Sequence, residues 1–73
     1  ETGTGSHIDA EAVIQRSVLF NDCRVSRGAT IIDSVLSENV YVGEGATIEG
    51  SVIGLGERIE AGSQIVDQSR PAP

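Results

Sequence analysis

Aliphatic side chains recur along this chain with a period of 17 residues. Three columns show the spacing: Ile14, Ile31, Ile48 and Ile65; Leu19, Leu36 and Ile53; and Ile8, Val25, Val42 and Ile59. An α-helix would need apolar residues about 3.6 positions apart, and it would not tolerate so many glycines. The intervals of six, five and six residues instead indicate short strands separated by regular bends.

Each interval has the same interior. Val25-Ser-Arg-Gly-Ala-Thr and Val42-Gly-Glu-Gly-Ala-Thr place a glycine fourth and a small residue fifth, whereas the five-residue unit Ile31-Ile-Asp-Ser-Val has Ser fourth and Val fifth. Glycine, Asn and Asp tolerate the left-handed conformation of a sharp bend. Two corners are therefore predicted at Gly5, Asp22, Asn39 and Gly56, and at Glu11, Gly28, Gly45 and Gly62. Ser17, Ser34 and Ser51 are expected to stack at a tighter third corner.

The fifth position of each unit predicts a second inward column, close to the corners, where only small side chains fit. Its expected members are Ala12, Val18, Cys23, Ala29, Val35, Val40, Ala46, Val52 and Ser63. Glu57 falls in the same column, and a carboxylate in an apolar interior is costly. We therefore expect the Glu57 corner to be displaced outward, or Arg58 or a water molecule to reach the carboxylate.

This pattern predicts an all-β fold, a single-stranded left-handed parallel β-helix with three faces and about four coils of 17 residues. Successive coils should stack with parallel pairing at the strand spacing of about 4.8 Å. The β-helix is expected over residues 1–69, and a non-repetitive tail over 70–73, where two prolines cannot continue a ladder. Residues 1–7 fit either a natural hexapeptide or, in part, an expression tag.

Composition and charge exclude some classes of partner and location. The 73 residues are enough for one domain, with a formal net charge of −6. Such acidity argues against a nucleic-acid partner, which needs a basic face. No apolar run of about 18 residues is present, so no membrane span is predicted. The single cysteine cannot form an internal disulfide, and we therefore expect a cytoplasmic location.

No catalytic, cofactor-binding or metal-binding residue is predicted in this segment. His7 is the only histidine, and one histidine cannot supply the several protein ligands of a zinc site. It is expected to be an exposed terminal side chain. Cys23 is expected to be a small buried hydrophobe. No glycine-rich phosphate loop and no carboxylate pair stands out.

One outward column carries unusual chemistry. His7, Arg24, Tyr41 and Arg58 share it, so that Arg24 and Arg58 should flank Tyr41 on adjacent coils, close enough to stack. Arg24, Tyr41 and Arg58 form either a surface patch for an anion or a partner, or a solvated ladder that shields the strand edges.

Two further pairs of charges are expected to face one another one coil apart. Arg27 with Glu44, and Arg16 with Asp33, should form surface ion pairs of small energetic value.

Outward apolar side chains point to an interface. Phe20, Ile32, Leu55 and Val66 lie outside the inward columns, and several exposed apolar residues on one small prism favour a covered surface. At least two of them are expected in an interface. We therefore expect self-association, either side by side, with a trimer favoured, or end to end through the open first coil.

Four segments resemble a known family: Ser17-Val-Leu-Phe-Asn-Asp-Cys-Arg-Val, Ile32-Asp-Ser-Val-Leu, Asn39-Val-Tyr-Val-Gly-Glu-Gly-Ala and Ser51-Val-Ile-Gly. They are similar to the C-terminal domain of sugar-nucleotide pyrophosphorylases, above all glucose-1-phosphate adenylyltransferase, with mannose-1-phosphate guanylyltransferase a near second. The resemblance covers roughly residues 8–66. It departs from the family at Glu57.

The resemblance implies a division of labour. In that family an N-terminal nucleotide-binding domain joins a sugar 1-phosphate to a nucleoside triphosphate with magnesium. The β-helix domain supports oligomerisation and, in adenylyltransferases, regulation. No catalytic residue carries over to this chain, whose expected partners are further copies and the parent's catalytic domain. Two alternatives stay open: a fragment of a hexapeptide-repeat acyltransferase, which would need a histidine at a subunit groove and a protruding loop, and a stand-alone β-helix scaffold.

Overall fold

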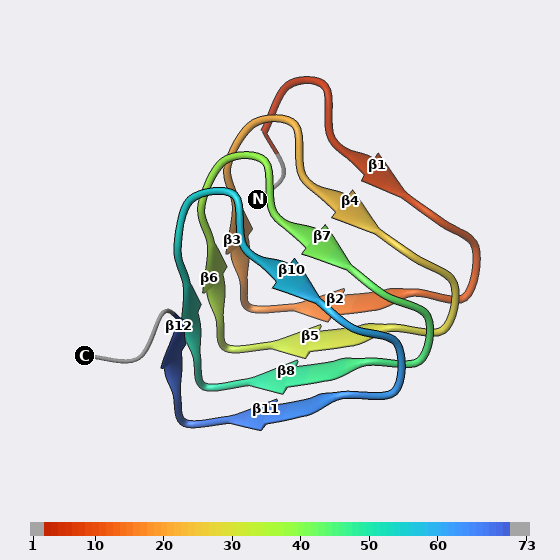
Figure 1. The fold of residues 1–73 in the computed structure, drawn as a ribbon. Helices are drawn as coiled ribbons and strands as arrows, with labels where there is room; N and C mark the ends of the chain where they lie inside the picture. The colour runs from red at the N-terminus through yellow and green to blue at the C-terminus, as the bar shows by residue number, and fades with distance from the viewer. Residues whose placement is uncertain (1–2, 71–73) are drawn as a thin grey trace.

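Residues 3–70, the part of the chain that the computed structural model describes, contain twelve short β-strands joined by turns, and no helix (Figure 1). Each strand spans two or three residues, because the chain bends again after every five or six positions. The strands are β1 His7–Ile8, β2 Val13–Gln15, β3 Val18–Leu19, β4 Arg24–Val25, β5 Thr30–Ile32, β6 Val35–Leu36, β7 Tyr41–Val42, β8 Thr47–Glu49, β9 Val52–Ile53, β10 Arg58–Ile59, β11 Gln64–Val66 and β12 Ser69–Arg70.

The strands form three parallel sheets that are the three sides of a triangular prism (Figure 1). The first sheet has the order β1-β4-β7-β10, the second β2-β5-β8-β11 and the third β3-β6-β9-β12. The register pairs residues 17 positions apart, as in Ile14 with Ile31 and Leu19 with Leu36. The chain visits the three sheets in turn and then starts the next coil, which confirms the predicted left-handed β-helix of about four coils.

The aliphatic columns fill the interior. The core consists of Leu19, Val25, Ile31, Leu36, Val42, Ile48, Ile53, Ile59 and Ile65, together with Cys23, Ala29, Val40 and Ala46. Ile8 and Ile14 are only partly buried, because the first coil has a neighbouring coil on one side alone. The burial predicted for the aliphatic columns is confirmed, with Ile8 and Ile14 as the partial cases.

The prediction that the valines of the third corner point inward was wrong. Val18 and Val52 point outward, with 37% and 52% of their surface exposed, and Val35 is half-buried. The serines of the same units lie inside instead: Ser34 is 2% exposed and Ser51 is 1% exposed. Strand side chains alternate between the two faces, so the inward small residue stands two positions before the next aliphatic. In the five-residue unit that position is the serine.

Each coil turns through three corners with a left-handed residue at each. The two predicted six-residue corners are confirmed, at Gly5, Asp22, Asn39 and Gly56 and at Glu11, Gly28, Gly45 and Gly62. At the five-residue corner the left-handed residues are Arg16, Asp33, Gly50 and Asp67. The first three directly precede the inward serines, and Asp67 precedes Gln68 at the equivalent position. Every φ in these three sets lies between 48° and 79°.

The ladder extends through Arg70. β12 pairs with β9, and Arg70 occupies the position that Ile53 holds one coil earlier. Glu1, Thr2 and Pro71–Pro73 lie outside the described residues, and with them most of the predicted tail. Within residues 3–70 no helix has the length and hydropathy needed to cross a membrane.

Candidate interaction surfaces

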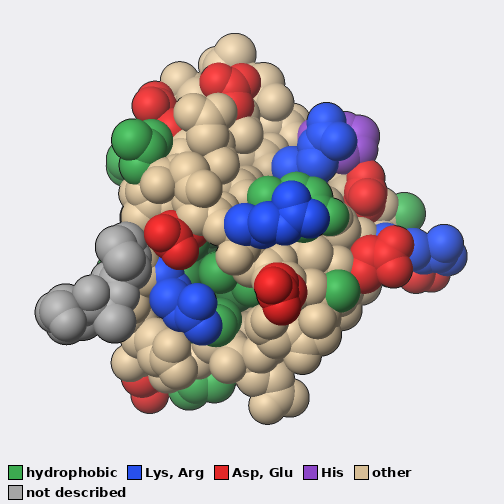
Figure 2. Space-filling view, in the orientation of Figure 1, with side chains coloured by type: hydrophobic (Ala, Val, Ile, Leu, Met, Phe, Trp, Pro, Cys, Tyr) green, Lys and Arg blue, Asp and Glu red, His purple; other side chains and the backbone are tan. Residues whose placement is uncertain are grey.

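The predicted Arg24–Tyr41–Arg58 column lies on the outer surface of the first sheet. The register places His7, Arg24, Tyr41 and Arg58 next to one another on consecutive coils. The Arg58 guanidinium lies over the Tyr41 ring, 4.7 Å from its centroid, which is cation–π geometry. Within residues 3–70, neither Arg24 nor Arg58 takes part in an ion pair. Figure 2 shows basic side chains and the histidine gathered on this side of the molecule.

Two other basic side chains lie next to carboxylates. His7 Nε2 lies 2.6 Å from Asp9 Oδ1, with both side chains well exposed. Arg27 pairs at 3.0 Å with Glu11 of the preceding coil, so the predicted pairing with Glu44 was wrong. Gly28 stands above Glu11 in its column and has no side chain that would separate the Glu11 carboxylate from Arg27.

The predicted Arg16–Asp33 pair is confirmed. Arg16 Nε donates to Asp33 Oδ1 at 2.7 Å and its Nη2 donates to Oδ2 at 3.3 Å. The hydrogen bond and the charge of Arg16 lower the pKa of the Asp33 carboxyl. The same contact raises the pKa of Arg16. The pair spans two coils on the outside of the third corner, where 67% of the Arg16 side chain and 51% of the Asp33 side chain are exposed.

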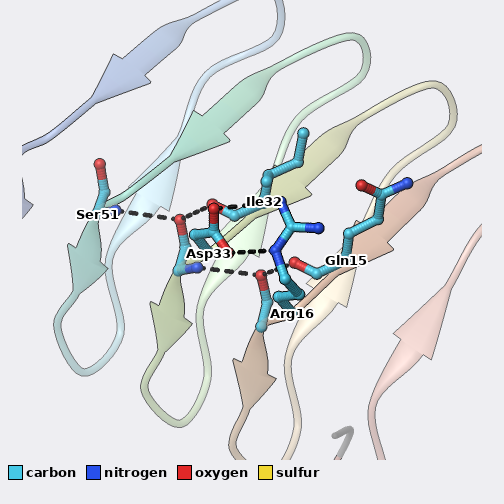
Figure 3. Close-up of polar contacts among 7 residues, drawn as sticks. Gln15, Arg16, Ile32, Asp33 and Ser51 are labelled. Atoms are coloured by element: carbon cyan, nitrogen blue, oxygen red, sulfur yellow. Dashed lines mark hydrogen bonds and ion pairs between the residues drawn. The ribbon is translucent and has the colours of Figure 1, made fainter.

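A ladder of hydrogen-bonded serines lies on the inside of that corner (Figure 3). Ser34 Oγ donates to the Ile32 carbonyl at 2.8 Å and accepts the Ser51 N–H at 3.1 Å. Ser17 Oγ accepts the Ser34 N–H in the same way, at 3.1 Å. Ser51 Oγ accepts the Gln68 N–H, also at 3.1 Å. Each hydroxyl therefore links one coil to the next.

The short corner explains why serine is needed there. At the second corner the N–H of the inward small residue bonds to the carbonyl three residues earlier, as Ala29 does to Ser26 at 3.2 Å and Ala46 to Gly43 at 3.3 Å. The five-residue unit has one residue fewer in its bend, and the N–H of Ser34 bonds to the neighbouring coil's hydroxyl instead. Buried backbone donors must find a partner, and the serine column supplies it.

Cys23 and Glu57 share one inward column. Cys23 is 1% exposed, its Sγ lies 3.0 Å from the Ser37 carbonyl oxygen, and burial raises the pKa of its thiol. Cys23 is therefore a small buried residue, as expected. Glu57 is half-buried and keeps contact with solvent in the last complete coil, and the outward displacement of its corner stays a prediction.

The outer surface of the third sheet is apolar. It carries Val18, Val35 and Val52 on three consecutive coils, and Phe20, 47% exposed, directly after β3. We call these four residues the valine face. Sequence reasoning missed the valines because it counted them as inward. Alternation counted back from Leu19, Leu36 and Ile53 would have identified them.

The four predicted interface residues do not form one patch. Phe20 belongs to the valine face, whereas Ile32 and Val66 lie on the outer surface of the second sheet, in β5 and β11. Leu55 is 70% exposed, at the corner between the third and first sheets. Within residues 3–70 no cluster of three or more His, Cys, Asp or Glu side chains has the geometry to hold a metal ion.

Residues 3–70 match the family described as GlmU-like, C-terminal hexapeptide. The chain belongs to this family. None of the curated proteins matches it. Membership of the GlmU-like hexapeptide family agrees with the resemblance to the hexapeptide-repeat domain of sugar-nucleotide pyrophosphorylases. The GlmU-like chain is thus a β-helix domain of a nucleotidyltransferase-like protein.

Proposed function

We propose that this chain is the structural and self-associating domain of a sugar-1-phosphate nucleotidyltransferase, whose chemistry takes place in a separate nucleotide-binding domain. Family membership and the regular β-helix support the first part of the proposal. The exposed apolar side chains support the second. A side-by-side trimer is the proposed assembly, and the parent's catalytic domain is the second proposed partner. A regulatory role would fall to the Arg24–Tyr41–Arg58 column.

The observation that carries self-association is the number of large apolar side chains that the fold leaves in solvent. Within residues 3–70 these are Val13, Val18, Phe20, Val52, Leu55 and Val66, all at least 37% exposed. The interior columns are complete without them. Three of the six, Val18, Phe20 and Val52, lie on the third sheet, and apolar side chains that share one exposed surface favour an interaction site there.

Side-by-side contact is favoured over end-to-end contact. In the last described coil, Arg58, Glu60, Ser63 and Arg70 lie beside Ile59 and Ile65. Stacking a second copy there would remove charged groups from water, at a high cost in free energy. The outward strand positions of the third sheet offer apolar side chains instead, at Val18, Val35 and Val52.

Two other parts of the proposal rest on single residues. His7 forms an exposed pair with Asp9 on a regular strand, and this arrangement does not favour the acyltransferase alternative. Cys23 is a buried free thiol, which supports placing the protein in a reducing cytoplasm.

Sedimentation equilibrium on the 73-residue chain tests self-association directly. We expect the average mass to rise above the monomer value in the micromolar to millimolar range and to level off at a closed oligomer. A single monomeric species at all concentrations would contradict the proposal. Mass that grows without limit would indicate end-to-end stacking instead, because an open head-to-tail contact does not close.

A further inference from the structure

The fourth coil, residues 54–70, differs from the two coils before it in the residues that stand at its inward positions. The second and third coils each have five apolar residues and one serine there, and all of these are buried. In the fourth coil only Ile59 and Ile65 are still aliphatic. The other inward positions hold polar residues, which are Glu57, Ser63, Gln68 and Arg70. One coil earlier the same positions hold Val40, Ala46, Ser51 and Ile53.

The backbone of the fourth coil continues the ladder at these positions. β12 pairs with β9, so that Arg70 stands over Ile53. The Glu57 carbonyl accepts the Tyr41 N–H at 3.0 Å, in the regular pattern of the first sheet. Both charged residues therefore stand in register with the coil before them.

The charged residues lower the stability of the prism at these positions. Glu57 and Arg70 are both half-buried, and neither takes part in an ion pair within residues 3–70. A partly desolvated charge without a partner is unfavourable, whereas valine or isoleucine would bury apolar surface against the third coil. A residue that breaks the local pattern without a gain in stability points to another role.

Position at one end of the stack does not by itself require polar residues. The first coil, residues 3–19, lies at the other end of the described stack. It has apolar residues at four of its inward positions, which are Ile8, Ala12, Ile14 and Leu19. The two ends of the described prism therefore differ, because the first coil is apolar inside and the fourth is largely polar.

This difference bears on end-to-end stacking of two copies. Unpaired strand edges favour pairing with another chain, and a head-to-tail contact that does not close grows into a filament. In a continued stack, Leu19 of a second copy would stand over Arg70 of the first and would remove its charge from water. Repeat proteins use polar terminal repeats to stay soluble. We infer that the fourth coil is a polar cap, in which Glu57 and Arg70 prevent a second copy from continuing the stack.

The test gives the fourth coil the residues of the third. The variant Glu57→Val/Arg70→Ile restores the apolar columns without changing the net charge. The control, Arg24→Ile/Glu49→Val, makes the same replacements at exposed outward positions of the first and second sheets. Far-UV circular dichroism establishes that each variant is folded, and the single variant Arg70→Ile keeps the readout available if the double variant does not fold.

We expect the average mass of Glu57→Val/Arg70→Ile in sedimentation equilibrium to keep rising with concentration without levelling off. The parent chain and the control should not show this growth. In urea denaturation at low concentration, the midpoint of the double variant should lie above that of the parent chain.

Equal masses of the double variant and the parent chain at every concentration would overturn the polar cap. Unlimited growth of the parent chain, or growth of the control as large as that of the double variant, would overturn it too. A urea midpoint below that of the parent chain would show that the charged residues stabilise the coil and would also contradict the inference. The mass of the parent chain decides the proposed self-association separately, because the cap is measured by the difference between the variant and the parent.

Discussion

Replacing Ser34 with alanine isolates the contribution of the serine ladder to stability. The substitution removes one oxygen atom and leaves the volume of a 2% exposed side chain almost unchanged, so no significant cavity opens. It deletes the acceptor of the Ser51 N–H, 3.1 Å away, and the donor to the Ile32 carbonyl, 2.8 Å away. The Ser51 N–H lies in a buried part of the corner, whereas the Ile32 carbonyl is part-buried.

The expected cost follows from what is left unpaired. A buried donor or acceptor without a partner costs about 1–3 kcal/mol, more than the net value of an ordinary hydrogen bond. The carbonyl of Ile32 also accepts the N–H of Gly50 at 3.0 Å, so it keeps one partner. The Ser51 N–H has no comparable substitute. We therefore expect Ser34→Ala to lower the free energy of unfolding by about 1–3 kcal/mol.

Urea denaturation followed by far-UV circular dichroism measures this difference, at a concentration low enough to keep the chain dissociated. Each kcal/mol also lowers the melting temperature of a domain this small by about 4–8 °C. Ser37→Ala is the matched control, because no side-chain hydrogen bond ties the half-buried Ser37 within the described residues. If the two variants unfold within about 0.5 kcal/mol of each other, the ladder does not stabilise the corner.

Four further outcomes are expected. Leu36→Ala should destabilise by about 2–5 kcal/mol, checked by the same denaturation, because a fully buried side chain is replaced by a cavity. Gly45→Ala should cost about 1–2 kcal/mol from backbone strain alone, since φ is +69° and an added Cβ meets nothing within 4 Å; an unchanged midpoint would refute this. Carbon-13 NMR should show that the Asp33 carboxyl titrates below its usual range, because Arg16 lowers its pKa, and Arg16→Gln should raise that pKa again. The contribution of the pair to stability is present above the unfolded-state pKa of Asp33 and is lost as the pH falls through its folded-state pKa. Cys23 should react slowly with a thiol reagent at neutral pH and quickly after unfolding, because burial raises its pKa; fast reaction of the folded protein would show an open corner.

The sequence alone determined the architecture of this protein. A period of 17 with intervals of six, five and six residues defines three faces, and every residue then has a known neighbour 17 positions away. Ile14 with Ile31 and Arg24 with Tyr41 are paired as this rule predicts. In a solenoid the tertiary contacts repeat a local pattern, so periodicity predicts them directly.

The tertiary structure showed which way the residues of the shortest corner face, which alternation counted back from the next aliphatic residue also predicts. A repeat unit of five residues and a unit of six place the inward small residue at different distances from the preceding aliphatic residue. The serines therefore took the interior, and the valines became a surface. The partner of Arg27 was decided the same way, since Glu11 and Glu44 are each one coil distant and only side-chain geometry separates them. Spacing along the chain specifies neighbours, but the local path of the backbone specifies the side of the sheet on which each side chain lies.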